Sequence, residues 1–277
     1  MTQTFFIYRV FSGPQANGNI AAVSFCSQQQ DPRSLSKELF VNRLPNNAVL
    51  SLLSPRTAGE FYVRWFDYHG DIQRCGHGAF AAAAYLHGHN KLVETTAVLH
   101  SHVGERFYVG ADGSEYTLTL PDYGTPIQNE RGQILASLCG ATDMISLGGE
   151  AGYIALKLGS VAQLARFNPH PHIMQHCENA SLIVATQDKN HIYFRYFRCL
   201  RDPSHLSNKS KIPLQIDVIE DSATGSAAPC LLLLFSIPSG QKMSVQQLSG
   251  RGGEYRCQLN PDHTTLISAR VQLIKHN

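Results

Sequence analysis

Two apolar stretches of this 277-residue chain carry no charge, and each begins shortly after a turn that contains glycine. The first runs from Ala79 to Leu86 and the second from Pro229 to Phe235. A helix at the surface of a globular protein has a polar face, whereas a helix without one is normally buried at the centre of a domain. The sequence therefore predicts two similar halves, each wrapped around one buried helix.

The turns before these two helices carry titratable and small residues. The residues concerned are Cys75, Gly76, His77 and Gly78 in the first turn, and Asp221, Thr224, Gly225 and Ser226 in the second. The first backbone N–H groups of a helix lack partners within the helix, and the positive end of the helix dipole favours an anion. Each turn is therefore predicted to hold a carboxylate or a phosphate without a basic side chain.

Length and composition limit the classes of protein that this chain can belong to. Its 277 residues, 43% of them apolar and 16% charged, fit a soluble globular protein of one large domain or two ordinary ones. The N-terminus lacks the features of a secretory signal, so a cytoplasmic location is expected. A formal charge of +2 without a run of lysine or arginine predicts no nucleic-acid partner, and no apolar run is long enough to predict a membrane span.

Cysteine usage agrees with a reducing compartment. The seven cysteines are scattered, their number is odd, and no two are spaced as Cys-x-x-Cys. Three histidines between residues 170 and 176, with Cys177, could suggest a metal site, but their spacing fits no zinc pattern and the neighbouring prolines favour a loop. No metal is predicted.

The rest of the chain is predicted to be mainly strands. Apart from the strand that leads into the second turn, these are Phe5–Phe11, Ala21–Phe25, Val49–Leu53, Glu60–Phe66, Val93–His100, Arg106–Val109, Glu115–Leu120, Met144–Leu147, Tyr153–Leu158, Ser181–Thr186, His191–Phe197, Ser244–Leu248, Gly253–Leu259 and Thr264–Ile274. Further helices are predicted at Ser34–Val41, which Ser34 could cap, Gly132–Cys139 and Ser160–Arg166. The polar segment from Arg201 to Lys211 is predicted to be a loop that could cover a cleft.

Three motifs, in order along the chain, match a known family. They are Val10-Phe11 with Gly18-Asn19 and Ala21-Ala22-Val23, Arg64-Trp65-Phe66 followed by Cys75-Gly76-His77, and the segment from Glu220 to Ala228. Together they span nearly the whole chain. The sequence resembles the phenazine-biosynthesis isomerase (PhzF-like) family, which shares its fold with diaminopimelate epimerase and proline racemase.

The resemblance implies an α+β fold of two similar domains, each an antiparallel sheet or barrel around a central helix. With the Pro121–Pro126 segment as linker, the domains are expected at residues 1–122 and 127–277, and the last strands could return to the first half. Family members are often homodimers, so a homodimer is expected here. The resemblance also implies that no cofactor takes part: one side chain takes a proton from carbon and returns it elsewhere on a small carboxylate substrate.

The resemblance also assigns roles to individual residues. His77, Asp221 and Ser226 match family positions that contact substrate and assist proton movement, and the backbone of Gly76 and Gly225 would bind it. Thr224 and Gly78, in the same two turns, are grouped with the substrate-binding residues. The alternative roles are structural: Asp221 could serve only as a helix cap, and His77 could only cap its helix or bond a carbonyl.

The chain departs from the family at the base. The family supplies a glutamate where this sequence has Asn46, and an amide cannot accept a proton at neutral pH. In the related racemases and epimerases, residues at the helix starts, usually cysteines, act as acid and base. Cys75 lies at a comparable place, and a thiolate whose pKa is lowered by the helix dipole could be the base; its alternative role is a small buried residue.

Three functions remain open on this reasoning. The first is an isomerase that moves a proton on a small carboxylate, in the manner of dihydro-hydroxyanthranilate isomerisation, with Asp221 or His77 moving the proton. The second is an epimerase or dehydratase that uses Cys75. The third is a protein that has lost catalysis because of Asn46 and binds a small carboxylate or a partner.

Overall fold

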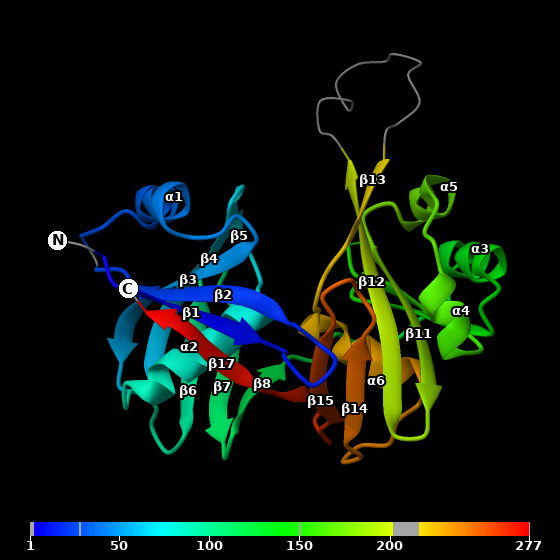
Figure 1. Cartoon of the computed structure of the whole chain (residues 1–277). Helices are drawn as coiled ribbons and strands as arrows, with labels where there is room; N and C mark the ends of the chain where they lie inside the picture. Colours follow the sequence, from blue (N-terminus) through cyan, green and yellow to red (C-terminus); the bar gives the residue numbers. More distant parts are fainter. Residues whose placement is uncertain (1–2, 28, 150, 202–215, 277) are drawn as a thin grey trace.

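The computed structural model describes residues 3–27, 29–149, 151–201 and 216–276. The helices and strands form two halves that lie side by side (Figure 1). The first half contains β1 (Phe5–Val10), β2 (Asn19–Phe25), α1 (Pro32–Asn42), β3 (Ala48–Thr57), β4 (Glu60–Asp67), β5 (Gly70–Ile72), α2 (Gly76–Gly88), β6 (Thr96–Ser101), β7 (Arg106–Asp112) and β8 (Glu115–Leu120). The second part of the chain contains α3 (Glu130–Cys139), β9 (Asp143–Leu147), β10 (Tyr153–Lys157), α4 (Val161–Arg166), α5 (Pro171–Met174), η1 (Gln175–Cys177), β11 (Ser181–Asp188), β12 (His191–Arg201), β13 (Ile216–Glu220), η3 (Gly225–Ala227), α6 (Ala228–Leu234), β14 (Met243–Gln247), β15 (Gly253–Leu259), β16 (Thr265–Ala269) and β17 (Val271–His276).

The two charge-free stretches form the central helices α2 and α6, as predicted. Every residue of α2 from Gly78 to Leu86 is buried, and strands of the first half surround the helix (Figure 1). Six of the seven residues of α6 are buried, and this helix packs against β9, β10, β15 and β16. The predicted α+β class with central buried helices is confirmed.

Strand pairing repeats in the two halves. In the first half β2 pairs in parallel with β3 across α1, and β4 pairs in parallel with β6 across α2. In the second half β10 pairs in parallel with β11 across α4 and α5, and β12 with β14 across η3 and α6. Parallel neighbours need a long crossover, which a helix supplies. All the described strands belong to one connected sheet, whose part in each half is mixed, and each central helix is also a crossover.

The last strands join the halves. β16 pairs with β8 and β17 pairs with β1, so the final strand of the chain lies in the first half. The predicted single strand at 264–274 is therefore wrong. It is broken at Arg270 because its two parts pair with different strands, and the Arg270 carbonyl accepts a hydrogen bond from the Phe11 backbone N–H at 3.2 Å. The division at residues 122 and 127 stays a prediction.

One further expectation changes at the level of a single residue, and another falls mostly outside the described residues. Asp31 rather than Ser34 is the N-cap of α1: its side chain accepts from the backbone N–H of Arg33 and of Ser34, and Pro32 occupies the first turn, where no N–H is needed. The predicted loop from Arg201 to Lys211 lies outside the described residues except for Arg201, which ends β12.

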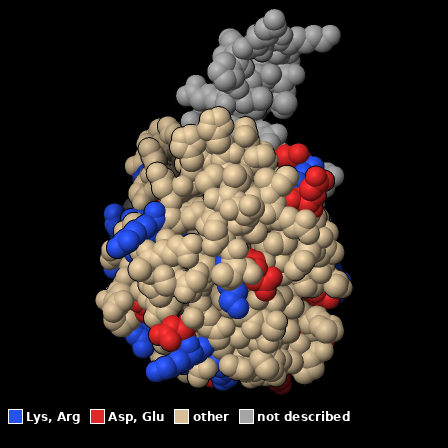
Figure 2. All heavy atoms as spheres, turned by 90° about the vertical axis from the view of Figure 1, so that its right-hand side faces the viewer, with Lys and Arg blue, Asp and Glu red and all other residues tan. Residues whose placement is uncertain are grey.

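On the outer face of the second half, the described side chains form no continuous basic surface. Figure 2 shows this face, and the described Lys and Arg side chains on it lie in small separate groups, several of them beside Asp or Glu. In the described part of the chain, no helix is both long enough and apolar enough to cross a bilayer.

The first turn of α2 fits tightly against the sheet at Gly78. A Cβ atom there would lie 2.7 Å from Cδ1 of Trp65 and 2.9 Å from Oγ of Ser51, and the Ser51 hydroxyl donates to the Gly78 carbonyl at 3.0 Å. At Gly76, two residues earlier, the nearest atom to such a Cβ would be 3.8 Å away, on Leu118. Gly78 therefore sets how closely α2 approaches β3 and β4.

Gly78→Ala is expected to lower the free energy of unfolding by about 1–3 kcal/mol, because an added methyl group overpacks the contact with Trp65. Urea unfolding measures the loss, and Gly76→Ala, in the same turn, is the matched control and should change stability much less. Equal stability of the two variants would show that the sheet yields easily at this point.

Candidate active site

A cavity of about 700 Å³ lies where the two halves meet. Eight of the nine predicted site residues line it, namely Asn46, Cys75, Gly76, His77, Asp221, Thr224, Gly225 and Ser226. Gly78 does not, because it is buried against Trp65. The start of α2 and the start of η3, which are about 150 residues apart in the sequence, therefore border one space.

Cys75 caps α2 rather than serving as an exposed nucleophile. Its Sγ accepts a hydrogen bond from the Gly78 backbone N–H at 3.3 Å and lies 3.5 Å from Nδ1 of His77. Burial raises the pKa of the Cys75 thiol to about 12, and the charges of Asp221 and Asp67 raise it too, against the hydrogen bond from Gly78. The lowered pKa expected from the helix dipole is therefore wrong, because loss of water outweighs the dipole here.

His77 lies in the first turn of α2 and is a neutral ring at neutral pH. Burial lowers its pKa, and the negative charge of Asp221 acts in the opposite direction. The two side chains come from different halves, so this electrostatic interaction acts across the cavity between them. A neutral imidazole can donate from one nitrogen and accept at the other.

The second turn is held in shape by Gln247 of β14, which is buried. Its Oε1 accepts from the Thr224 backbone N–H at 2.6 Å, and its Nε2 donates to the Asp221 carbonyl at 2.5 Å. The Thr224 hydroxyl donates to Oδ2 of Asp221, also at 2.5 Å. Thr224 therefore acts by positioning the Asp221 carboxylate.

Gly225 and Asn19 lock this turn to the first half. A Cβ at Gly225 would lie 2.9 Å from the Phe11 ring, so only glycine allows this approach. The Asn19 side chain donates to the Ala223 carbonyl at 3.0 Å. The motif around Gly18 and Asn19 is thus explained by contact between the halves.

Several lining residues were missed by sequence reasoning. Tyr123 and Tyr153 stack with ring centroids 5.9 Å apart, and burial raises the pKa of both hydroxyls. Arg74, just before the first turn, is paired with Glu105 at the cavity wall. Tyr123 lies in the segment predicted as a linker, and no sequence signal marked it as part of a site.

The described residues hold no group of three or more His, Cys, Asp or Glu side chains that could bind a metal ion. His170 and His172 stack on one another, with the His170 ring accepting from the His172 backbone N–H at 3.3 Å. Their place is the N-cap and first turn of α5, so this histidine-rich segment has a structural role here.

Comparison with known proteins identifies the family. Residues 8–273 match the family model PhzC-PhzF, described as phenazine biosynthesis-like protein. The chain belongs to the PhzC-PhzF family. It is similar to an uncharacterized isomerase of Vibrio cholerae, with 26% identity over 274 residues that cover 96% of this chain and 87% of the relative. The names of the family and of this relative point to an isomerase.

Solved structures show the same fold. A PhzF-family crystal structure from Enterococcus faecalis has a TM-score of 0.74 and 20% identity, covering 100% of this chain and 98% of that one. A more distant structure, the hydroxyproline epimerase of Agrobacterium vitis with bound trans-4-hydroxy-L-proline, has a TM-score of 0.55 and 12% identity, covering 99% and 90%. The predicted resemblance to PhzF-like proteins and to the epimerase fold is confirmed.

Asp221→Asn is expected to lower the pKa of His77 further, because it removes the negative charge that favours the imidazolium. His77 would then take up a proton only at a more acidic pH than in the unmodified protein. An NMR titration of the imidazole Cε1–H, assigned by comparison with His77→Gln, measures the shift. Asp188→Asn, at an exposed hairpin turn, is the control, and an equal His77 pKa in Asp221→Asn would refute the interaction.

Cys75 is expected to react slowly with iodoacetamide. A pKa of about 12 leaves almost no thiolate between pH 7 and 9, so native Cys75 should be alkylated at least about 100-fold more slowly than in the unfolded chain. Peptide mass spectrometry at fixed times in buffer and in urea measures the two rates. Fast labelling of native Cys75 at pH 7 would contradict the raised pKa and would support the hypothesis that Cys75 is a thiolate base.

Proposed function

We propose that this chain is an isomerase that moves a proton within a small carboxylate-bearing substrate, in the manner of dihydro-hydroxyanthranilate isomerisation. The observation that supports it most is that His77 and Asp221 line the same cavity and that the Asp221 charge acts on the His77 pKa, beside the backbone amides of two helix starts. The relative from Vibrio cholerae is named as an isomerase, which agrees with this reaction type. The cytoplasmic location and the homodimer stay predictions.

The amides at the start of α2 would hold the substrate carboxylate. Gly76 and His77 belong to the first turn, where backbone N–H groups have no partner within the helix. When a proton leaves the neighbouring carbon, negative charge spreads onto the carboxylate, and the same amides stabilise it. Arg106 and Arg198 are exposed at the cavity, and their positive charge would attract an anionic substrate.

His77 and Asp221 would assist movement of the proton between two carbons of the substrate. Neutral His77 can pass a proton through its ring, and the Asp221 charge stabilises the transient imidazolium. Ser226 and the tyrosines Tyr123 and Tyr153 supply hydroxyl groups to the same space. The alternative enzyme, an epimerase with a Cys75 thiolate, is disfavoured by the raised pKa of that thiol.

A binding protein without catalysis remains the second candidate, and one observation favours it. Asn46 lines the cavity, so an amide occupies the wall where the family's glutamate is expected. Such a protein would bind small carboxylates without exchanging their protons. The next experiment separates the two.

The isomerase is expected to incorporate deuterium from D2O into a carboxylate substrate, with at least about a 100-fold slower rate in Asp221→Asn and in His77→Gln. Mass spectrometry over a panel of cyclic and amino-acid carboxylates measures the rate. Exchange that survives in these variants but is lost in Cys75→Ser would support the epimerase. No exchange, with a carboxylate still raising the melting temperature, would leave the binding protein.

A further inference from the structure

Among the described residues, three carboxylates line the cavity, and they differ in what already binds them. They are Asp67, Glu105 and Asp221. Glu105 accepts two hydrogen bonds from Nε of Arg74, at 2.8 and 2.7 Å, so its charge is neutralised. Oδ2 of Asp221 accepts from the Thr224 hydroxyl, and the charge of this carboxylate is already assigned to stabilising the His77 imidazolium. A general base needs a carboxylate oxygen that no cation or donor already occupies.

Asp67 meets that requirement. It ends β4 and begins a two-residue hairpin turn, where its Oδ1 accepts from the backbone N–H groups of His69 at 2.8 Å and Gly70 at 2.9 Å. Among the described residues, no hydrogen bond or ion pair reaches its Oδ2. One oxygen therefore fixes the side chain, and the other is left for the cavity.

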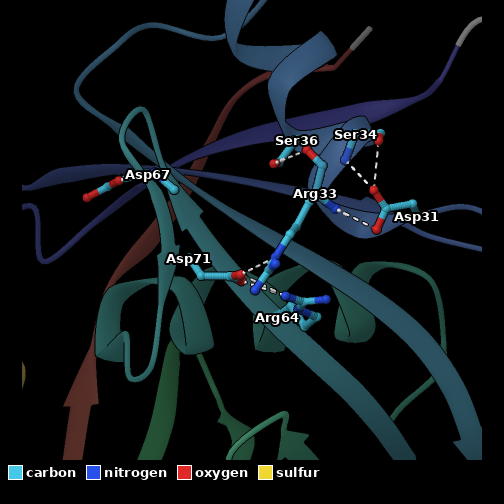
Figure 3. Close-up of polar contacts among 8 residues, drawn as sticks. Asp31, Arg33, Ser34, Ser36, Arg64, Asp67 and Asp71 are labelled. Carbon is cyan, nitrogen blue, oxygen red and sulfur yellow. Dashed lines mark hydrogen bonds and ion pairs between the residues drawn. The ribbon is translucent and has the colours of Figure 1, made fainter.

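The arginines near this hairpin are engaged by another carboxylate. Asp71 of β5 accepts from Nε of Arg33 at 2.9 Å and from a terminal nitrogen of Arg64 at 2.7 Å. Figure 3 shows the Asp71 carboxylate facing both arginines, while Asp67 lies apart from the cluster and points away from it. Arg64 of β4 therefore pairs with Asp71, and its side chain and that of Asp67, three residues apart on one strand, point to opposite faces of the sheet.

Asp67 also borders the place where the family's glutamate is missing. β3 pairs with β4 at Leu50 and Phe66, so the start of β3 lies beside the end of β4. Asn46 and Asn47 are the two residues directly before β3, which begins at Ala48. Both asparagines line the cavity together with Asp67. The charge of Asp67 also acts on Cys75, the N-cap of α2, beside the amides that would hold a carboxylate.

We infer that Asp67 is the general base of the proton shift, in place of the carboxylate absent at position 46. This inference rests on the proposed isomerase function. Oδ2 of Asp67 takes the proton from the carbon next to the substrate carboxylate, and the electron pair of that C–H bond moves into the substrate's conjugated system. The carboxylic acid formed then returns the proton to a second carbon, so one C–H bond breaks, one forms, and no oxidant is needed.

Asp67→Asn tests the assignment, because the amide keeps the Oδ1 acceptor for the hairpin turn but cannot take a proton. On any substrate that the unmodified protein exchanges, the deuterium wash-in rate should fall at least about 100-fold. The melting temperature, and its rise on adding that carboxylate, should be kept. Asp188→Asn is the matched control, since Asp188 also begins a two-residue hairpin turn, opposite His191, but does not line the cavity.

A second variant moves the carboxylate instead of removing it. In Asp67→Asn with Asn46→Glu, a carboxylate stands again on the same wall, and exchange should recover at least about tenfold over Asp67→Asn alone. Exchange in Asp67→Asn within about threefold of the unmodified rate would overturn the inference and leave the isomerase function standing. A loss in Asp67→Asn without recovery in the double variant would also count against it. No exchange by the unmodified protein on any substrate would overturn the function itself and the inference with it.

Discussion

The close contact between the first turn of α2 and strands β3 and β4 is the constraint on which the site depends. At Gly78 the helix touches Trp65 and Ser51 with no room for a methyl group. That contact fixes where the backbone amides of Gly76 and His77 point, because the rest of α2 is enclosed by the first-half sheet. A site made of backbone amides has no side-chain rotamers to adjust, so its precision must come from such packing.

The second half reaches the same precision by different means. η3 and α6 form a short helix whose first turn is held by polar contacts: Gln247 of β14 binds both ends of the segment between Asp221 and Thr224. Two similar folding units thus present two helix starts to one cavity. The strands β16 and β17 belong to the second part of the chain and pair with β8 and β1 of the first half. These pairings hold the two helix starts in a fixed position relative to each other.

The sequence predicted the features that follow from local pattern. The absence of charge in 79–86 and 229–235 located both central helices, and small polar residues before them located most of the cavity lining. What it missed depends on long-range pairing. The break at Arg270 arises because the two strands have different partners, and Tyr123 enters the site because the chain between the halves passes beside Tyr153. Neither the strand partners on the two sides of Arg270 nor the contact of Tyr123 with Tyr153 can be predicted from residues close to them in sequence.

The pKa of Cys75 shows where local reasoning fails for chemistry as well. A cysteine at a helix start is expected to ionise easily, yet burial and two nearby carboxylates, Asp221 and Asp67, keep this thiol protonated. The same two charges disfavour any further anion unless the amides and arginines at the cavity offset them. A substrate carboxylate would therefore bind at the start of α2, and the proton to be moved would lie between two carboxylates from opposite halves. Asn46 adds no charge to this wall, and a glutamate there without removal of Asp67 would add a further negative charge and weaken anion binding.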